Sequence, residues 1–286
     1  MRLSRFKRIT GDDWFSAITF SFAASIPLLL FLLICLLIIK SSLGFKTFGF
    51  GFIVSSSWDP LNDVYGALPF IYGTIISSLI ALAIAVPLGL GCAIFLAEVT
   101  QSKVKEQVAT MIDMLAAIPS VVYGLWGIFV LSPFLGGPSL LVGGVILSIM
   151  ILPTITAISR EVFQAVPHSL RESALALGAT KWETFKLAVF GPALSGLVGA
   201  IILGLGRALG ETMAVTMVIG NRANISPSLF APAYTLASVI ANEFAEATSE
   251  VNLAVLVELG LILLVITVIV NGAARFFVWK TTGHKA

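Results

Sequence analysis

The sequence predicts an all-α polytopic membrane protein with six transmembrane helices. Hydrophobic residues make up 58% of its 286 positions and charged residues only 11%, which is more apolar surface than one soluble core buries. Six long apolar runs each reach the roughly 20 residues that one helical crossing requires. The runs are continuous and do not alternate at every second residue as strands of a membrane barrel do, so helices are expected.

We expect the helices within residues 15–278, and the runs are 15–39, 70–97, 108–131, 139–158, 193–219 and 253–278. The first run follows a basic amino terminus and has no small-residue cleavage site after it. At some 25 residues it is also too long for the apolar core of a cleaved signal peptide. We therefore interpret it as a retained anchor. Pro119 and Pro153 fall inside runs and predict kinks.

Basic residues predict the orientation, because they are enriched in cytoplasmic loops. Six crossings place both termini on one side, and most Lys and Arg would lie there: Arg2, Arg5, Lys7, Arg8, Lys103, Lys105, Arg160, Arg171, Lys181, Lys186, Arg275, Lys280 and Lys285. Only Lys40, Lys46 and Arg222 would lie opposite. We expect one permease domain over 1–286, with cytoplasmic termini, an amino-terminal segment 1–14, and external loops at 40–69 and 220–252. Topology thus accounts for the net charge of +2 without a nucleic-acid partner.

The external loops leave two interpretations open. The first is rich in Gly and Phe, and the second carries Glu243, Glu246 and Glu250. They could dock an external partner, or they could be aromatic anchors at the interface and a solvated acidic face. Cys35 and Cys92 lie inside predicted helices, so neither a disulfide framework nor a metal site is indicated.

The longest cytoplasmic linker, 159–192, has the pattern of a structured element. Charged, small and aromatic residues recur at helical spacing, Pro167 opens one segment and Gly178 breaks it. Leu177 and Trp182 offer apolar contact. The pattern fits docking of another protein, and it equally fits an amphipathic helix on the membrane surface.

Two charged residues, Arg207 and Glu211, lie near the centre of the predicted helix 193–219. Each costs about 2.5 to 3.5 kcal/mol at a helix centre on insertion scales, so both should face protein or water. At spacing i, i+4 they can pair with each other. Gly206 and Gly210 form a Gly-x-x-x-Gly flank that predicts close packing on a neighbouring helix. The pair could line a transport pathway, or it could be a buried ion pair that keeps subunits in register.

Other charged residues in the runs carry weaker signals. Asp113 and Glu98 lie near predicted helix ends, where solvation at the interface is the simpler interpretation. Glu258 enters the last helix from the external side, and the sequence leaves its surroundings open.

Two motifs carry a family resemblance. ESALALG, residues 172–178, resembles the E-A-A-x-x-x-G signature in the cytoplasmic loop of inner-membrane subunits of bacterial ABC importers. Glu172, Ala174 and Gly178 match, and Ser173 stands for the first alanine. IPSVVYGLWG at 118–127 and GLGRALGETMAVTMVIGN at 204–221 resemble the PstC-type permease subunits of high-affinity phosphate importers. The Leu-Pro pair expected downstream of the loop is missing, and proline is displaced to Pro192, which leaves the start of helix five open.

The resemblance implies a type I ABC importer permease fold in the bacterial cytoplasmic (inner) membrane. It implies a subunit that is not itself an enzyme and forms half of an ATP-driven pathway for inorganic phosphate. The chain has no Gly-x-x-x-x-Gly-Lys-Ser/Thr loop, so ATP and Mg would be bound by a separate PstB-type ATPase dimer. The other implied partners are a PstA-type permease subunit and a PstS-type phosphate-binding protein, either periplasmic or lipid-anchored.

The resemblance also implies roles for particular residues. Glu172, Ser173, Ala174 and Gly178 would couple the chain to the ATPase, and Arg207 and Glu211 would line the substrate pathway. Arg207 offers planar donors to an oxyanion, while Glu211 would neutralise it in the empty state.

The alternatives are a permease for another oxyanion, such as sulfate or molybdate, and a secondary transporter acting alone. The secondary transporter would predict paired broken helices, which the sequence does not display.

Overall fold

The computed structural model describes residues 11–100 and 102–282. These residues are helical with connecting loops, and their only β pairings are two isolated bridges, Asp59 with Val64 and Gly220 with Ala233. Among them, five helices are long and apolar enough to cross a membrane, and a bent helix pair makes a sixth candidate span. The five are Trp14–Phe48, Leu68–Val99, Leu140–Ala165, Lys181–Gly210 and Glu250–Phe276. The all-helical prediction of six spans is confirmed at this level.

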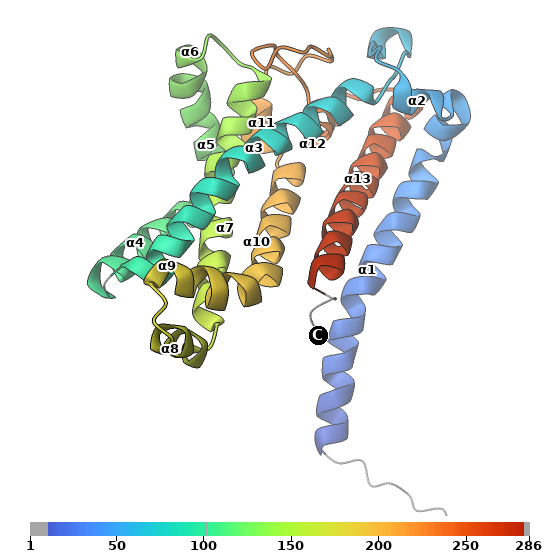
Figure 1. Cartoon of the computed structure of the whole chain (residues 1–286). Helices are drawn as coiled ribbons and strands as arrows, with labels where there is room; N and C mark the ends of the chain where they lie inside the picture. Colours follow the sequence, from blue (N-terminus) through green and yellow to red (C-terminus); the bar gives the residue numbers. More distant parts are fainter. Residues whose placement is uncertain (1–10, 101, 283–286) are drawn as a thin grey trace, which may run out of the picture.

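The first and last helices lie side by side (Figure 1). α1 spans Gly11–Phe48 and α13 spans Glu250–Thr282, so both are longer than the apolar runs predict. They connect two ends of the molecule: the α2 end, which carries α2 (Gly51–Val54), and the α8 end, which carries α8 (His168–Ala176) (Figure 1). The predicted basic segment 1–14 lies mostly outside the described residues.

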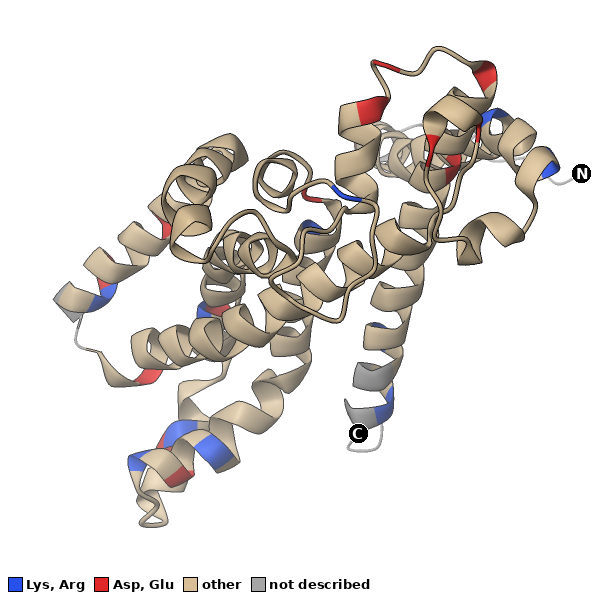
Figure 2. Cartoon of the chain, turned by 90° about the horizontal axis from the view of Figure 1, so that it is seen from above, with Lys and Arg blue, Asp and Glu red and all other residues tan. Residues whose placement is uncertain are grey.

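Three helices form the centre of the bundle: α3 (Leu68–Ile94), α7 (Leu140–Ala165) and α10 (Phe190–Gly210). α3 packs along α7, and α7 packs along α10. Small residues permit the close approach, since a Cβ at Gly144 would meet the side chain of Ile80 at 2.5 Å. Their core contains Ala81, Ala85, Leu147 and Ile151, all buried. Figure 2 shows that charged residues gather at helix ends and loops and leave most of the long helices free of charge.

The third predicted span is broken. Residues 108–131 were expected as one helix, but α4 (Ser102–Ala117) and α5 (Ser120–Trp126) enclose a bend of 90°. Pro119 lies at the bend, with an extended backbone (φ −58°, ψ 140°). It has no N–H to donate, so α4 cannot continue through it. The Tyr123 hydroxyl donates to the Leu115 carbonyl at 2.8 Å and ties the two arms together. After α5 the chain continues through η3 (Gly127–Leu131) and α6 (Ser132–Phe134).

The fifth predicted helix is also broken, and the break lies between its two charged residues. α10 ends at Gly210, Glu211 has extended backbone (φ −71°, ψ 126°), and the short α11 spans Met213–Val218. The prediction of one helix over 193–219 is therefore wrong. Gly210 just before the break is a poor helix former, which makes this a favourable place for α10 to end.

The linker 159–192 is structured, as its periodicity predicts. α8 begins after Pro167, Gly178 adopts a positive φ of 87°, and α9 (Lys181–Thr184) opens with a Thr180–Glu183 capping box. α9 continues through η4 (Phe185–Val189) into α10. Helix five therefore starts at Lys181, ahead of Pro192, and forms one span up to Gly210.

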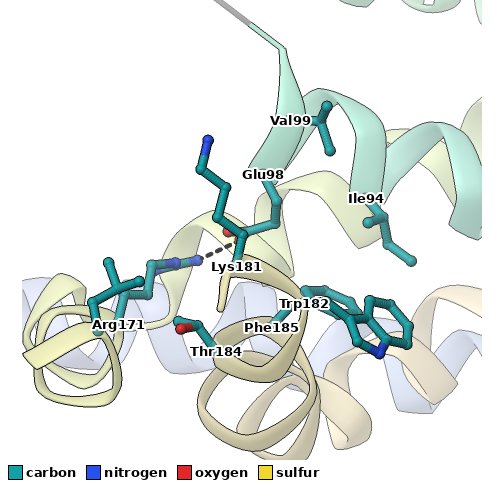
Figure 3. Close-up of a pocket in the computed structure, with 9 residues that line it drawn as sticks. Ile94, Glu98, Val99, Arg171, Lys181, Trp182, Thr184 and Phe185 are labelled. Atoms are coloured by element: carbon teal, nitrogen blue, oxygen red, sulfur yellow. Dashed lines mark hydrogen bonds and ion pairs between the residues drawn. The ribbon is translucent and has the colours of Figure 1, made fainter. Parts of the chain in front are cut away.

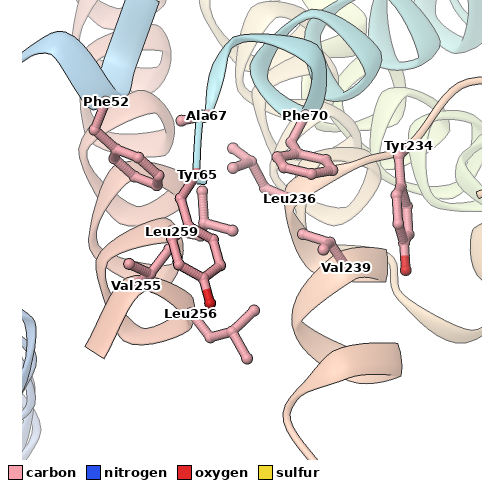
Figure 4. Packing of buried hydrophobic residues seen from close by; sticks show 10 residues of the cluster. All are labelled: Phe52, Tyr65, Ala67, Phe70, Tyr234, Leu236, Val239, Val255, Leu256 and Leu259. Carbon is pink, nitrogen blue, oxygen red and sulfur yellow. The ribbon is translucent and has the colours of Figure 1, made fainter. Parts of the chain in front are cut away.

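The two loops at the α2 end pack against each other. Phe52, Tyr65 and Phe70 meet Tyr234 and Leu236 in a buried cluster that also contacts α13 (Figure 4). α3 joins this cluster through its first turn, and α12 (Leu236–Glu243) joins it from the second loop, while the short η1 (Pro60–Asn62) turns the first loop. The Trp58 indole nitrogen donates to both carboxylate oxygens of Glu243, at 3.2 and 3.1 Å. The two loops thus fold together into one packed unit at the α2 end.

Candidate functional site

Arg207 lies in the last turn of α10 and is exposed in this chain. Its Nη1 lies 3.4 Å from the hydroxyl oxygen of Thr154, which is near the middle of α7. Because Thr154 is about equally far from the two ends of that helix, Arg207 lies near mid-depth in the bundle. Within residues 11–100 and 102–282, the guanidinium forms no ion pair.

Glu211 faces a different partner. Its Oε1 accepts a hydrogen bond of 3.3 Å from the backbone N–H of Ala214, in the first turn of α11. The predicted i, i+4 ion pair between Arg207 and Glu211 is therefore wrong in this structure. Helical spacing aligns two side chains only while the helix continues. α10 ends at Gly210, which lies between Arg207 and Glu211, so the two side chains are no longer aligned.

The helix break offers each charge a favourable position. Peptide dipoles leave partial negative charge at a helix carboxyl end and partial positive charge at an amino end. Arg207 lies at the carboxyl end of α10, and Glu211 precedes the amino end of α11. Both charges thus gain from helix ends without pairing with each other.

The donors of Arg207 are largely free. A guanidinium carries five N–H donors, and its one hydrogen bond among the described residues is the long contact with Thr154. The site can therefore offer a planar fork of donors to an anion with several oxygens. Thr154 has no sequence signal of its own, since threonines are common in membrane helices, and sequence reasoning missed it.

The flank formed by Gly206 and Gly210 is open in this chain. A Cβ built at either glycine meets nothing within 4 Å among the described residues. The predicted packing of this flank on a neighbouring helix does not occur within the described chain. The space beside these two glycines is not filled by the described helices of this chain.

The predicted coupling residues lie together at the α8 end. Glu172 and Ser173 are exposed on α8, Ala174 is half-buried, and Gly178 is exposed in the turn that follows. Leu177 beside them is 90% exposed. The segment thus presents small and apolar side chains away from the bundle.

A half-buried ion pair between α8 and the end of α3 was not predicted. Arg171 Nη2 lies 2.8 Å from Glu98 Oε1, and the two side chains are only 14% and 20% exposed. Both residues line a cavity of about 390 Å³ with Lys181, Trp182 and Phe185 (Figure 3). Glu98, expected to be solvated at the interface, is therefore an internal partner. The available signal was weak: Arg171 directly precedes the loop motif, but nothing in the sequence points from it to Glu98.

Two remaining carboxylates differ sharply in environment. Glu258 on α13 is fully buried, and neither of its carboxylate oxygens has a hydrogen-bond partner in the described structure. Asp113 on α4 is exposed. Within the described ranges, no cluster of three or more His, Cys, Asp or Glu side chains could hold a metal ion.

Comparison with known proteins identifies the chain's relatives. Residues 85–282 match the family model described as "Binding-protein-dependent transport system inner membrane component". The chain is 46% identical over 261 residues to the "Phosphate transport system permease protein PstC" of Mesorhizobium japonicum, covering 82% of this chain and 80% of that protein. It is 40% identical to the protein of the same name in Haemophilus influenzae, covering 97% and 98% of the two chains.

Solved structures support the fold. A bacterial ABC transporter involved in the import of the acidic polysaccharide alginate aligns with a TM-score of 0.68 at 16% identity, over 98% of this chain and all of the other. A structure of the inward-facing MetNI methionine ABC transporter aligns with a TM-score of 0.57 at 18% identity, over 74% of this chain and 93% of the other. At these identities the likeness concerns the fold alone.

Proposed function

The chain belongs to the PstC family of phosphate transport permeases and is a multi-pass inner-membrane subunit of a phosphate ABC importer, and we propose that its Arg207 is the cation that phosphate meets inside the membrane. The observation that carries this proposal is the contact at mid-depth, where an exposed guanidinium is held by a single hydroxyl 3.4 Å away.

Chemistry favours this role for Arg207. Phosphate near neutral pH is an anion with several oxygens, and a guanidinium binds such groups through two parallel N–H donors while remaining charged. A cation paired with a carboxylate would present fewer donors to the substrate. In the described residues Arg207 has no such partner, so most of its donors remain available to an anion.

Glu211 would set how tightly phosphate is held. It lies just past the break that follows Arg207, where its carboxylate is fixed by the Ala214 N–H. From there it opposes the field of Arg207 without blocking the donors. A pathway residue must release its anion as well as attract it, and a nearby negative charge weakens binding. This role replaces the direct neutralisation that an i, i+4 pair would have supplied.

Replacement of Arg207 tests the proposal. Arg207→Gln should abolish phosphate uptake in the assembled importer, and Arg207→Lys, which keeps the charge but loses the fork, should lower uptake by at least about tenfold. Lys105 on α4 is a matched basic control, and Lys105→Gln should leave uptake unchanged. Wild-type uptake by assembled Arg207→Gln complexes would remove Arg207 from the pathway.

We further propose that the α8 end faces the cytoplasm and docks a PstB-type ATPase dimer, which binds the ATP and Mg. Described basic residues concentrate toward this end, including Lys181, Lys186 and Arg275, as cytoplasmic segments require. Leu177 and the small residues around Ala174 offer a partner an exposed surface. A PstA-type permease would complete the pathway beside this chain, and a PstS-type protein would deliver phosphate at the α2 end.

Cross-linking tests the docking. A single cysteine at Ala174 or Gly178, in a background with Cys35 and Cys92 replaced by serine, should cross-link to the ATPase in the complete importer. A cysteine at exposed Leu61, at the α2 end, is the control and should not. The docking assignment fails if positions 174 and 178 label no better than position 61.

A further inference from the structure

Arg171 joins three separate elements at the α8 end. It belongs to α8, its Nη2 pairs with Glu98 in η2 (Phe95–Val99) at the end of α3, and its fork reaches two carbonyls at the end of α7. Nη1 lies 2.5 Å from the Val166 oxygen, and Nη2 lies 2.6 Å from the Phe163 oxygen. Figure 3 shows Arg171 and Glu98 pointing toward each other, joined by a dashed line, among the residues that line the cavity.

These two carbonyls lie at the end of α7, where the Phe163 oxygen also accepts from the Val166 N–H at 3.4 Å. The last carbonyls of a helix have no partner within it, and they carry the negative end of the helix dipole. Arg171 donates to the Val166 carbonyl, adds a second donor to the Phe163 carbonyl, and brings a compensating positive charge. Because all three acceptors bind one planar group, they hold the guanidinium in one orientation.

α8 has few other attachments to the bundle. None of its residues is buried, and its backbone packs on α9 and η4. Arg171 is therefore the side chain that ties α8 to the ends of α3 and α7. The same α7 carries Thr154, the hydrogen-bond partner of Arg207. A continuous series of contacts thus runs from α8 through Arg171 and α7 to the charged site.

We propose that Arg171 is a positioning residue that transmits movement of α8 to α3 and α7. The proposal rests on the proposed docking of the ATPase at α8, and it names the joint through which that docking acts. When α8 moves, the Arg171 guanidinium moves the end of α7 and the end of α3 with it. Without the guanidinium contacts, α8 would still dock, but its movement would reach the bundle through α9, η4 and the two-residue link Val166–Pro167 to α7, and no side chain would connect it to α3.

The complete importer in proteoliposomes provides the test, with phosphate uptake and ATP hydrolysis measured on the same vesicles. Arg171→Lys keeps the charge but cannot bind three acceptors in one plane. It should lower the phosphate transported per ATP hydrolysed by about tenfold. Lys181→Met is the matched control, because Lys181 lines the same cavity and forms no ion pair in the described residues. Its ratio should stay at the wild-type value.

A charge exchange separates a three-way joint from a simple ion pair. Arg171→Glu combined with Glu98→Arg restores opposite charges, but a carboxylate cannot donate to the Phe163 and Val166 carbonyls. The ratio should remain low in this double variant. Full recovery would show that the Glu98 pair alone suffices and would overturn the joint.

Cross-linking distinguishes this proposal from the docking on which it rests. The cysteine at position 174 should label the ATPase equally in wild-type and Arg171→Lys complexes. Loss of labelling in the variant alone would mean that Arg171 only holds α8 in place, which overturns transmission. Absence of labelling already in the wild-type complex would instead overturn the docking.

Discussion

Arg207 on α10 and Thr154 on α7 meet at 3.4 Å, between the end of one helix and the middle of another. The hydroxyl is the one hydrogen-bond partner of the guanidinium in the described residues, so it sets the direction in which the fork points. Under the proposed function, phosphate at Arg207 would meet donors whose direction Thr154 of α7 helps to set. Substrate binding at Arg207 should therefore depend on α7.

Thr154→Val should raise the phosphate concentration for half-maximal uptake by about two- to fivefold, since one neutral hydrogen bond contributes about 1 kcal/mol. Thr154→Ser keeps the hydroxyl and should restore the wild-type value. Thr156→Val is the control, because the Thr156 hydroxyl donates to the Leu152 carbonyl of its own helix at 2.8 Å. Initial uptake rates in vesicles measure the effect, and identical values for the Val and Ser variants at position 154 would contradict it.

Glu211 combines a charge with a helix-capping contact, and two substitutions separate them. Glu211→Gln keeps an oxygen for the Ala214 N–H and loses the charge, so assembly should persist while uptake changes. Glu211→Ala also loses the cap and should lower stability by about 1 kcal/mol. Yield of the assembled complex and uptake per complex are the measurements. Equal loss of assembly in both variants would assign Glu211 a structural role only.

Much of the fold was predictable because lipid imposes a simple rule on sequence. Every spanning segment must be apolar and must satisfy its own backbone, so composition and run length predict the helices. The two helix breaks were harder to predict. Pro119 signalled a kink but not a bend of 90°, and the end of α10 at Gly210 gave no signal that distinguishes it from glycines such as Gly206 inside the helix.

The candidate site was predictable only in part, for a related reason. A charged residue within an apolar run can be recognised from the sequence alone, so Arg207 and Glu211 could be singled out. Their partners are set by contacts between helices, and neither Thr154 nor the Arg171–Glu98 pair can be found from spacing along the chain. The i, i+4 rule failed because it assumes the unbroken helix that the structure lacks.

Glu243 at the α2 end predicts a pH dependence. Burial raises the pKa of its carboxyl above 4.5, the hydrogen bond from Trp58 opposes that rise, and Glu246 adds to it. Because the folded protein holds this proton more tightly than the unfolded chain, the stabilisation is fully present below pH 4.5. It is lost as pH rises through the folded pKa.

Thermal unfolding of the purified complex measures this dependence. Between pH 4.5 and neutrality, the wild-type midpoint should fall relative to that of Glu243→Gln, whose amide oxygen can still accept from Trp58. Glu250→Gln, at an exposed position, is the control and should follow the wild type. A constant difference between wild type and Glu243→Gln at every pH would contradict the assignment.

Gly44 on α1 lies against Glu258 on α13, and substituting each residue in turn measures the free energy of this contact. A Cβ at Gly44 would collide with Glu258 Oε2, while its other neighbours, Glu258 Cδ and Val255 Cγ2, lie at 3.6 Å, an ordinary contact distance. Gly44→Ala should therefore lower the thermal midpoint, because the end of the Glu258 side chain would have to shift within a fully buried environment.

The same substitution should be harmless once the carboxylate is gone. In a Glu258→Ala background, Gly44→Ala should cost little, which gives a coupling energy of about 0.5 to 3 kcal/mol in a double-mutant cycle. Gly272→Ala, where a Cβ meets nothing within 4 Å of the described structure, controls for the intrinsic effect of alanine in a helix. Glu258→Gln should be at least as stable as the wild type, because a buried carboxylate without a partner is costly. Equal costs of Gly44→Ala in both backgrounds would mean that the α1–α13 contact is not the one seen here.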